Sequence, residues 1–294
     1  MRKIFDIHMH FPRNWEKPGD DPTPLVEDLY EQAVAAGVTR ANFLCGGRFG
    51  ISHEDSIKHA QRHPDLFLPS AMIDPETTTP ERVAELRDMG YRGLKMIGVR
   101  RDYDTEDYFP VYEKAQELEM PILFHLGVIG GGLDYSITHP RRDAQAAESY
   151  RRWQEFARQG GRNVSAMRMR PFHLDTIANN FPHLKLIGAH LGGTGNYDET
   201  SSVARWRHNV FFDISGGTTI ERHALERRLI GEEIGYEKLI FGSDTAPEKI
   251  AEHIRRWDTI FDLLDATDDE RERVWWRNGA ELYGEEPADW IPSK

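Results

Sequence analysis

Short apolar runs recur along the chain and alternate with segments of helical periodicity. Eight runs of strand length occur in order, at residues 3–7, 40–44, 67–73, 93–96, 121–124, 185–189, 210–214 and 238–241. Several of them are apolar at nearly every position, as is typical of parallel strands that are covered on both faces. The pattern therefore predicts eight buried parallel strands.

Helical patterns fill the intervals between these runs. One begins at Thr23-Pro24 and ends at Gly37, and another begins at Thr79-Pro80 and ends at Gly90. Further helices are predicted at residues 109–119, 172–180, 221–230 and 248–264. An eightfold strand–helix alternation in a chain of 294 residues predicts an α/β fold, the (β/α)8 TIM barrel, as a single domain over residues 1–294. An open doubly wound sheet would require a phosphate-binding glycine fingerprint after an early strand, and the sequence has none.

The longest interruption of the pattern is an insertion between the fifth and sixth strands. It covers residues 127–171 and contains Gly130-Gly131-Gly132 and a predicted helix at residues 142–159. Active sites of these barrels are built from the loops that follow the strands. We therefore expect the insertion to lie over the active face.

Polar residues stand at the carboxyl ends of four predicted strands. The first strand ends in His8-Met9-His10, and alternate residues of a strand point the same way. The fifth run is followed by His125, the sixth by His190 and the eighth by Asp244. Because these ends meet at one mouth of a barrel, we predict that His8, His10, His125 and Asp244 bind a metal ion.

This donor set suits a divalent metal, with zinc expected first and iron or manganese also compatible. The chain has one cysteine, Cys45, so a structural zinc site made of thiolates is not expected. A catalytic ion would lower the pKa of its bound water toward neutrality. Taken singly, each residue has a plainer explanation: a histidine can be hydrogen-bonded in the core, and Asp244 can cap the following helix. The hypothesis depends on all four strand ends together.

The chain resembles the amidohydrolase-related barrel enzymes, in particular the subgroup that contains aminocarboxymuconate-semialdehyde decarboxylase. The similar segments span nearly the whole chain in the family's order: Asp6-Ile7-His8-Met9-His10, Gly93-Leu94-Lys95, Phe124-His125-Leu126-Gly127, His190-Leu191-Gly192-Gly193, Phe241-Gly242-Ser243-Asp244 and Asn278-Gly279-Ala280-Glu281-Leu282-Tyr283-Gly284. This family includes hydrolases, decarboxylases and hydratases, so the resemblance leaves the substrate open.

The resemblance also implies roles for single residues. His8, His10, His125 and Asp244 would ligate the metal, and Asp244 would also carry protons. His190 would polarise or deprotonate the metal-bound water, or bind a second ion. Lys95 would bridge two metals as a carbamate, or lie buried beside a carboxylate. Many relatives have a His-Pro pair after the fourth strand, where this chain has Met96-Ile97-Gly98.

Five further residues are candidates for substrate binding. Arg100 and Arg101 follow the fourth strand and would clamp a substrate carboxylate, unless Asp102 or Asp104 neutralises them. The aromatic residues Phe11, Trp15 and Tyr135 would line a binding site for an apolar substrate, or would simply pack against other residues of the loops.

Three reactions remain open at this stage. The first is hydrolysis of an ester, lactone, amide or thioester in a small substrate, one that carries a carboxylate if the arginines bind it. The second is non-oxidative decarboxylation or hydration of an unsaturated or aromatic acid with the same metal. The third is activation of dioxygen by iron in the histidine-rich site. A barrel that only binds a ligand is disfavoured by the complete set of metal ligands.

Charge and hydropathy restrict partners and location. The formal net charge of −12 would repel a nucleic-acid backbone, so we expect a small-molecule substrate and no nucleic acid. No apolar run approaches the ~20 residues of a membrane span, and none near the N-terminus has the length of a signal peptide. With a single cysteine, these features favour the cytoplasm. Trp290 in the C-terminal tail favours a subunit contact, so we expect a homo-oligomer, a dimer or larger.

Overall fold

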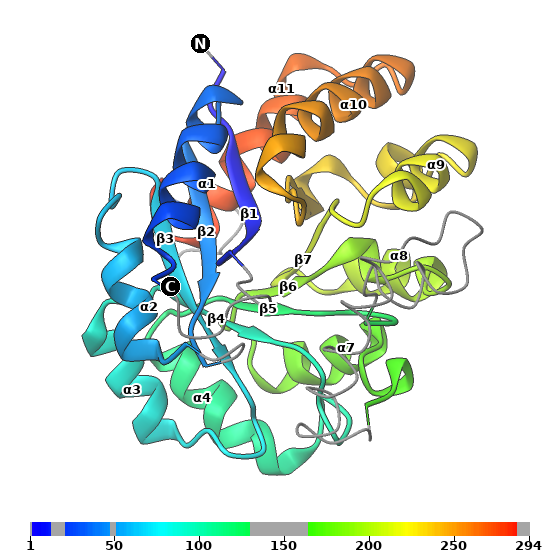
Figure 1. Ribbon diagram of the computed structural model, residues 1–294. Coiled ribbons are helices and arrows are strands. Elements are labelled where there is room, and N and C mark those ends of the chain that lie inside the picture. Colours follow the sequence, from blue (N-terminus) through cyan, green and yellow to red (C-terminus); the bar gives the residue numbers. More distant parts are fainter. Residues whose placement is uncertain (1, 13–20, 48–50, 130–163, 287–294) are drawn as a thin grey trace, which may run out of the picture.

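The structure is a computed structural model that describes residues 2–12, 21–47, 51–129 and 164–286. Eight parallel strands form one sheet in sequence order (Figure 1): β1 (Phe5–His10), β2 (Arg40–Cys45), β3 (Phe67–Ile73), β4 (Gly93–Met96), β5 (Ile122–Phe124), β6 (Leu186–Gly188), β7 (Val210–Asp213) and β8 (Leu239–Ile240). Two backbone hydrogen bonds join β1 to the segment after β8: Ile7 N donates to Phe241 O (2.9 Å), and Asp244 N donates to His8 O (2.9 Å). The predicted single-domain TIM barrel is confirmed.

Helices surround the strands (Figure 1): α1 (Thr23–Ala35), α2 (His53–Ala60), α3 (Pro80–Met89), α4 (Phe109–Glu117), α7 (Pro171–Asn180), α8 (Tyr197–Trp206), α9 (Thr218–Glu226), α10 (Ile250–Leu263), α11 (Asp268–Glu272) and α12 (Asn278–Leu282). The start and stop signals of α3 act as predicted. The Thr79 side chain accepts a hydrogen bond from Arg82 N, and Gly90 ends the helix with a left-handed φ of 110°. Most of the predicted insertion, 127–171, lies outside the described residues, as does its helix at 142–159.

Helix α8 was not expected from the sequence. Its segment is mostly polar, yet Glu199, Thr200 and Ser201 are all buried. Buried positions of this helix are occupied by polar residues, so the sequence lacks the stripe of apolar residues that predicts a helix. A sequence alone does not distinguish a buried polar side chain from one that faces water.

The strands separate an outer core from an inner one. The inner core contains one side chain from each of several strands, since the register pairs Met72, Lys95, Leu123, Ile187 and Phe211 in turn across β3 to β7. Four of these are apolar, and Lys95 is the one charged member, with no exposed surface. The barrel is therefore a packed interior that carries a lysine directly below the mouth.

The C-terminal segment packs against the end of the barrel where the strands begin. Trp275 is fully buried and Trp276 is 8% exposed, and Phe5 contacts the rings of Trp276 and Tyr283. The two tryptophans are thus part of the core. Within the described residues, no helix has the length and apolar character needed to cross a membrane.

A bulge in β1 contains His8 and precedes His10. The register with β2 shifts between Asp6 and Met9. There the fully buried Asn42 donates from Nδ2 to Ile7 O (2.9 Å) and accepts at Oδ1 from the Ser70 hydroxyl (2.6 Å). The side chain of Asn42 thus takes the place of a missing ladder bond beside His8.

Replacing Asn42 with alanine leaves the Ile7 carbonyl and the Ser70 hydroxyl short of partners inside the barrel. We expect Asn42→Ala to lower the free energy of unfolding by about 2–4 kcal/mol, as measured by urea denaturation. The control is Asn180→Ala on the exposed end of α7, where Nδ2 bonds only Thr176 O and the expected change is within about 0.5 kcal/mol. Equal effects of the two substitutions would contradict this account of the bulge.

Candidate metal centre

The end of β1 and the loop after β8 bring three predicted ligands together. His8 Nε2 lies 3.2 Å from His10 Nε2, and Asp244 Oδ1 lies 3.9 Å from His8 Nε2 and 3.5 Å from His10 Nε2. One ligand atom from each residue falls within 4.8 Å of the others. His8 is buried, whereas the side chain of Asp244 is 27% exposed, so the group opens toward solvent on the side of the carboxylate.

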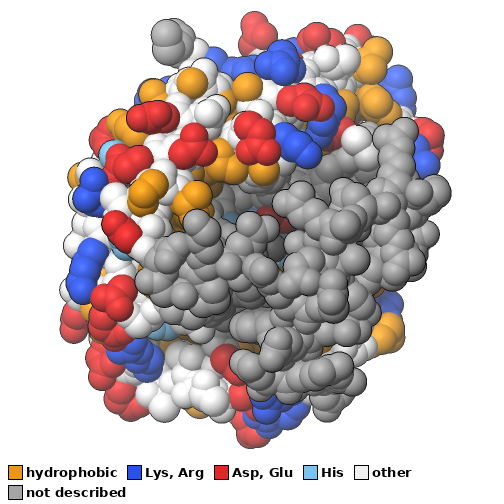
Figure 2. Space-filling model, viewed as in Figure 1, with side chains coloured by type: hydrophobic (Ala, Val, Ile, Leu, Met, Phe, Trp, Pro, Cys, Tyr) orange, Lys and Arg blue, Asp and Glu red, His pale blue; other side chains and the backbone are white. Residues whose placement is uncertain are grey.

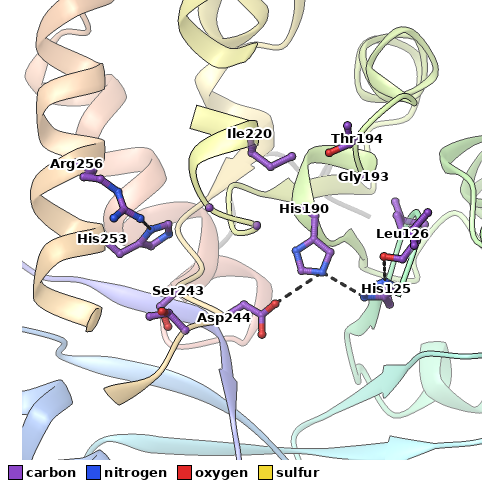
Figure 3. Close-up of a pocket in the computed structure, with 14 residues that line it drawn as sticks. His125, Leu126, His190, Gly193, Thr194, Ile220, Ser243, Asp244, His253 and Arg256 are labelled. Carbon is purple, nitrogen blue, oxygen red and sulfur yellow. Dashed lines mark hydrogen bonds and ion pairs between the residues drawn. The ribbon is translucent and has the colours of Figure 1, made fainter. Parts of the chain in front are cut away.

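His190 extends this group toward β5. Its Nε2 lies 3.9 Å from Asp244 Oδ2 and 3.2 Å from His125 Nδ1, and Figure 3 shows the ring between these two residues. His125 is therefore connected to Asp244 through His190 and does not belong to the close set of three. The five predicted residues form one continuous cluster at the mouth of the barrel.

Backbone strain is concentrated at these strand ends. Six non-glycine residues among those described have positive φ, and three of them are His190 (59°), Leu191 (49°) and Asp244 (41°). Side chains of L residues rarely adopt this region without a compensating constraint. The surrounding contacts therefore hold both loops in the conformation that aims His190 and Asp244 at each other.

Two buried carboxylates that the sequence reasoning missed hold the strand ends in place. Asp6 Oδ1 accepts hydrogen bonds from His8 N (3.0 Å) and Ser243 N (2.9 Å), which joins β1 to the loop after β8. Asp213, at the end of β7, accepts a hydrogen bond from His8 Nδ1 at Oδ2 (2.7 Å) and from His190 N at Oδ1 (2.8 Å). Asp213 is the one polar residue in the apolar run 210–214 and lies near its carboxyl end, and this signal would have identified it.

Burial and neighbouring polar groups together lower the pKa values of Asp213, His190 and His125. Burial alone would raise the pKa of Asp213, but His8, His190 and the Ser215 hydroxyl hold it well below its ordinary value. Burial lowers the pKa of His190 to about 4, against the opposing effect of Asp244 and Asp213. Burial, together with His190 and Lys95, also lowers the pKa of His125 well below its ordinary value. At neutral pH these two rings are therefore neutral, and Asp213 is ionised.

The donor set fits a divalent cation. An ionised carboxylate only accepts hydrogen bonds, so His8 carries its proton on Nδ1, toward Asp213, and has a lone pair on Nε2. This nitrogen, His10 Nε2 and an Asp244 oxygen together offer the mixed nitrogen and oxygen donors that zinc, manganese and iron accept.

Lys95 lies beside this donor set. Its Nζ is 3.3 Å from His8 Nε2, inside the barrel. The sequence allowed a bridging carbamate or a pair with a carboxylate, and one observed neighbour is the predicted ligand His8. The modification of Lys95 stays a prediction.

A cavity of about 420 Å³ adjoins the cluster. Figure 2 shows the hollow on this face, with histidine and acidic side chains visible inside it. His125, His190 and Asp244 form one side, and α9 and α10 contribute the other side through Ile220, His253 and Arg256. Arg256 is held by Glu221, at 3.0 Å from Nε, and by Glu252, at 2.6 Å from Nη1.

Three of the five predicted substrate-binding residues are described, and they do not line this cavity. Arg101 binds Glu76 and Asp107, not the predicted Asp102 or Asp104, and it stacks on the ring of Tyr108. Phe11 packs against Phe43 and His59. Neither residue lines the cavity, and neither does the exposed Arg100. Trp15 and Tyr135 lie outside the described residues.

Comparison with solved structures reveals barrels of the same fold. A probable 2-pyrone-4,6-dicarboxylic acid hydrolase from Acinetobacter baumannii, with citric acid bound, is 15% identical, with a TM-score of 0.64 over 96% of this chain and 99% of that chain. A 5-carboxyvanillate decarboxylase from Sphingomonas paucimobilis is 13% identical, with a TM-score of 0.58 over 97% and 99% of the two chains. A 4-oxalomesaconate hydratase from Rhodopseudomonas palustris is 17% identical, with a TM-score of 0.60 over 96% and 95%. At these identities the similarity shows the fold alone.

A search of curated proteins gave no match. The model of one protein family, described as amidohydrolase, matches residues 5–284, which is nearly the whole chain and includes every residue of the cluster. The chain is therefore a member of the amidohydrolase family.

Proposed function

We propose that the protein is a metal-dependent hydrolase that cleaves an ester, lactone, amide or thioester of a small substrate. One observation carries the proposal: His8, His10 and Asp244 place their ligand atoms within 4.8 Å of one another, next to a cavity lined by His125 and His190. Membership of the amidohydrolase family supports it.

His8, His10 and Asp244 would hold the ion, and His125 is the candidate for a further ligand. The bound ion would supply Lewis acidity, both for the carbonyl that is attacked and for the attacking water. Zinc is our first expectation, and the same donors accept manganese or iron.

His190 is placed to accept a proton. Its pKa of about 4 leaves the ring neutral at pH 7, and its Nε2 faces Asp244 and His125 at the edge of the cavity. We assign it the removal of a proton from water during the attack. Asp244, with its partly exposed carboxylate 3.9 Å from the same nitrogen, would pass that proton to the leaving group.

The charge of the cavity wall favours a neutral acyl group over an acid. Among the lining residues of the described chain, Arg256 is the one arginine, and Glu221 and Glu252 bind it. A decarboxylase or hydratase of an acid would bind the substrate carboxylate through the metal ion or through a free basic side chain, and the described wall holds no free basic side chain. The described wall therefore supports hydrolysis more than decarboxylation or hydration.

A panel of reactions tests this assignment. We expect the metal-loaded protein to hydrolyse at least one class among aryl esters, lactones, thioesters and amides, as measured by proton release in weakly buffered solution. Carbon dioxide release from aromatic acids, or hydration of unsaturated acids, without any hydrolysis would contradict the proposal. The protein would then be a decarboxylase or a hydratase.

Removing one ligand should abolish metal binding. We expect His10→Ala to retain less than about a tenth of the metal bound by the unchanged protein, measured per chain by elemental analysis after reconstitution, because the close set of three would lose one donor. The control is His183→Ala, whose side chain is exposed in the turn between α7 and β6 and whose loss should leave the metal content unchanged. Full metal content in His10→Ala would place the ion elsewhere.

Replacing the proposed base should separate catalysis from metal binding. We expect His190→Asn to keep its metal and to lose a factor of roughly 10²–10⁴ in kcat on the best substrate of the panel. Loss of one of two bound ions in this variant would instead make His190 a ligand of a second metal.

A further inference from the structure

A compact hydrogen-bonded group on the β7 end lies behind the predicted metal ligands. Asp213 and Ser215 are both fully buried, and between them they contact the rings of His8 and His190. These two histidines come from β1 and from the turn after β6, so the pair links residues far apart in the sequence. Asp213 and Ser215 do not line the cavity.

The proton positions around Asp213 follow from counting donors. Oδ1 accepts from His190 N (2.8 Å), from Ser215 N (3.0 Å) and from the Ser215 hydroxyl (2.5 Å). Oδ2 accepts from His8 Nδ1 (2.7 Å). An ionised carboxylate supplies no proton, so each of these bonds takes its proton from the other partner. His8 is thereby fixed with its hydrogen on Nδ1.

The same count of hydrogen-bond donors determines the tautomer of His190. The Ser215 hydroxyl has a single proton, and the 2.5 Å bond to Asp213 uses it. Ser215 Oγ can therefore only accept from His190 Nδ1, which lies 2.8 Å away. His190 must carry its hydrogen on Nδ1, and its Nε2 is left with a lone pair.

We propose that Asp213 and Ser215 are positioning residues that hold His8 and His190 in the Nδ1–H tautomer, so that both Nε2 lone pairs face the mouth of the barrel. The hydrogen bond made by one ring nitrogen determines which form the other nitrogen takes. The inference deepens the proposed function and rests on it for its catalytic consequence, whereas the tautomers themselves do not depend on it.

His125 supplies an independent reason why these lone pairs matter. Its Nε2 contacts Val128 O (3.3 Å), and a carbonyl oxygen only accepts, so the hydrogen of the neutral ring is on Nε2. The lone pair on His125 Nδ1 then faces the lone pair on His190 Nε2 across 3.2 Å. Two lone pairs at this separation repel each other unless a cation or a proton lies between them. With these tautomers, a cation or a proton at the mouth of the barrel is stabilised by both lone pairs.

Asp213 could alternatively be a metal ligand, since its carboxylate, His8 and His190 also lie within 4.8 Å of one another. The existing bonds argue against this, because both oxygens already accept hydrogen bonds and the residue has no exposed surface. The experiment separates the two roles.

The test measures the tautomers directly. Metal-free protein is labelled with 15N histidine, and long-range 1H–15N correlations report which ring nitrogen carries hydrogen. His8→Asn and His190→Asn assign the two sets of signals. We expect both rings as Nδ1–H in the unchanged protein. In Ser215→Ala, His190 loses its acceptor and should populate the Nε2–H form, while His8 stays as Nδ1–H.

Asp213→Asn should affect His8 instead. The asparagine amide either turns its NH2 toward His8 Nδ1, which forces the hydrogen to Nε2, or turns it toward the three donors at Oδ1. We expect His8 to become Nε2–H and the zinc affinity to fall by roughly 10- to 100-fold. Asp6→Asn is the matched control, because Asp6 is equally buried but its hydrogen-bond partners are His8 N and Ser243, and neither histidine ring is among them; both rings should keep Nδ1–H.

Two further measurements complete the comparison of the variants: the zinc affinity, from competition with a chelator, and kcat. We expect Ser215→Ala to bind zinc within about threefold of the unchanged protein and to lose about tenfold or more in kcat. Unchanged His190 tautomers in Ser215→Ala would overturn the proposal, and so would Nε2–H forms in the unchanged protein. Loss of zinc in Asp213→Asn with His8 still as Nδ1–H would make Asp213 a ligand and would also overturn it. If the protein shows the expected tautomers but binds no metal, the proposed function fails and the tautomer assignment stands.

Discussion

The parallel closure of the barrel is the constraint on which the rest of the structure depends. Because all eight strands run in the same direction, the residues that follow them share one mouth. The bond from Asp244 N to His8 O (2.9 Å) brings the end of the eighth strand against the first. Residues separated by more than two hundred positions in the sequence thereby become neighbours, and the polar group at each strand end is forced into one small buried space.

Burying ionisable groups so densely is unfavourable unless each one is compensated. Burial raises the pKa of Asp6, since its desolvation outweighs the two backbone N–H groups and Ser243 that stabilise the charge. Asp213 has the opposite balance, because His8 and His190 lie beside it. The two carboxylates are equally buried, yet their pKa values shift in opposite directions. The difference comes from the rings of His8 and His190, which lie beside Asp213. Strain at His190 and Asp244 completes the arrangement, which is maintained by the barrel and not by local preference.

Much of this architecture could be predicted from local pattern. The apolar runs identified the strands, and proline and glycine marked the ends of α3, since these signals depend on a few adjacent residues. The positions of His8, His10, His125, His190 and Asp244 followed from strand direction alone. Arg101 was misjudged because its partner Glu76 lies in another loop, and proximity in sequence pointed to Asp102 and Asp104. His253 and Arg256 come from a helix whose rotation about its axis a sequence does not fix.

The central claim is that His8, His10 and Asp244 share one cation, and anomalous diffraction from crystals of the zinc-reconstituted protein tests it most directly. The account predicts a peak about 2.0–2.2 Å from His8 Nε2, His10 Nε2 and an Asp244 oxygen. Asp102, Asp104 and His173 also place their ligand atoms within 4.8 Å of one another, and a single peak at that group, or one bound by Asp213, would contradict the account.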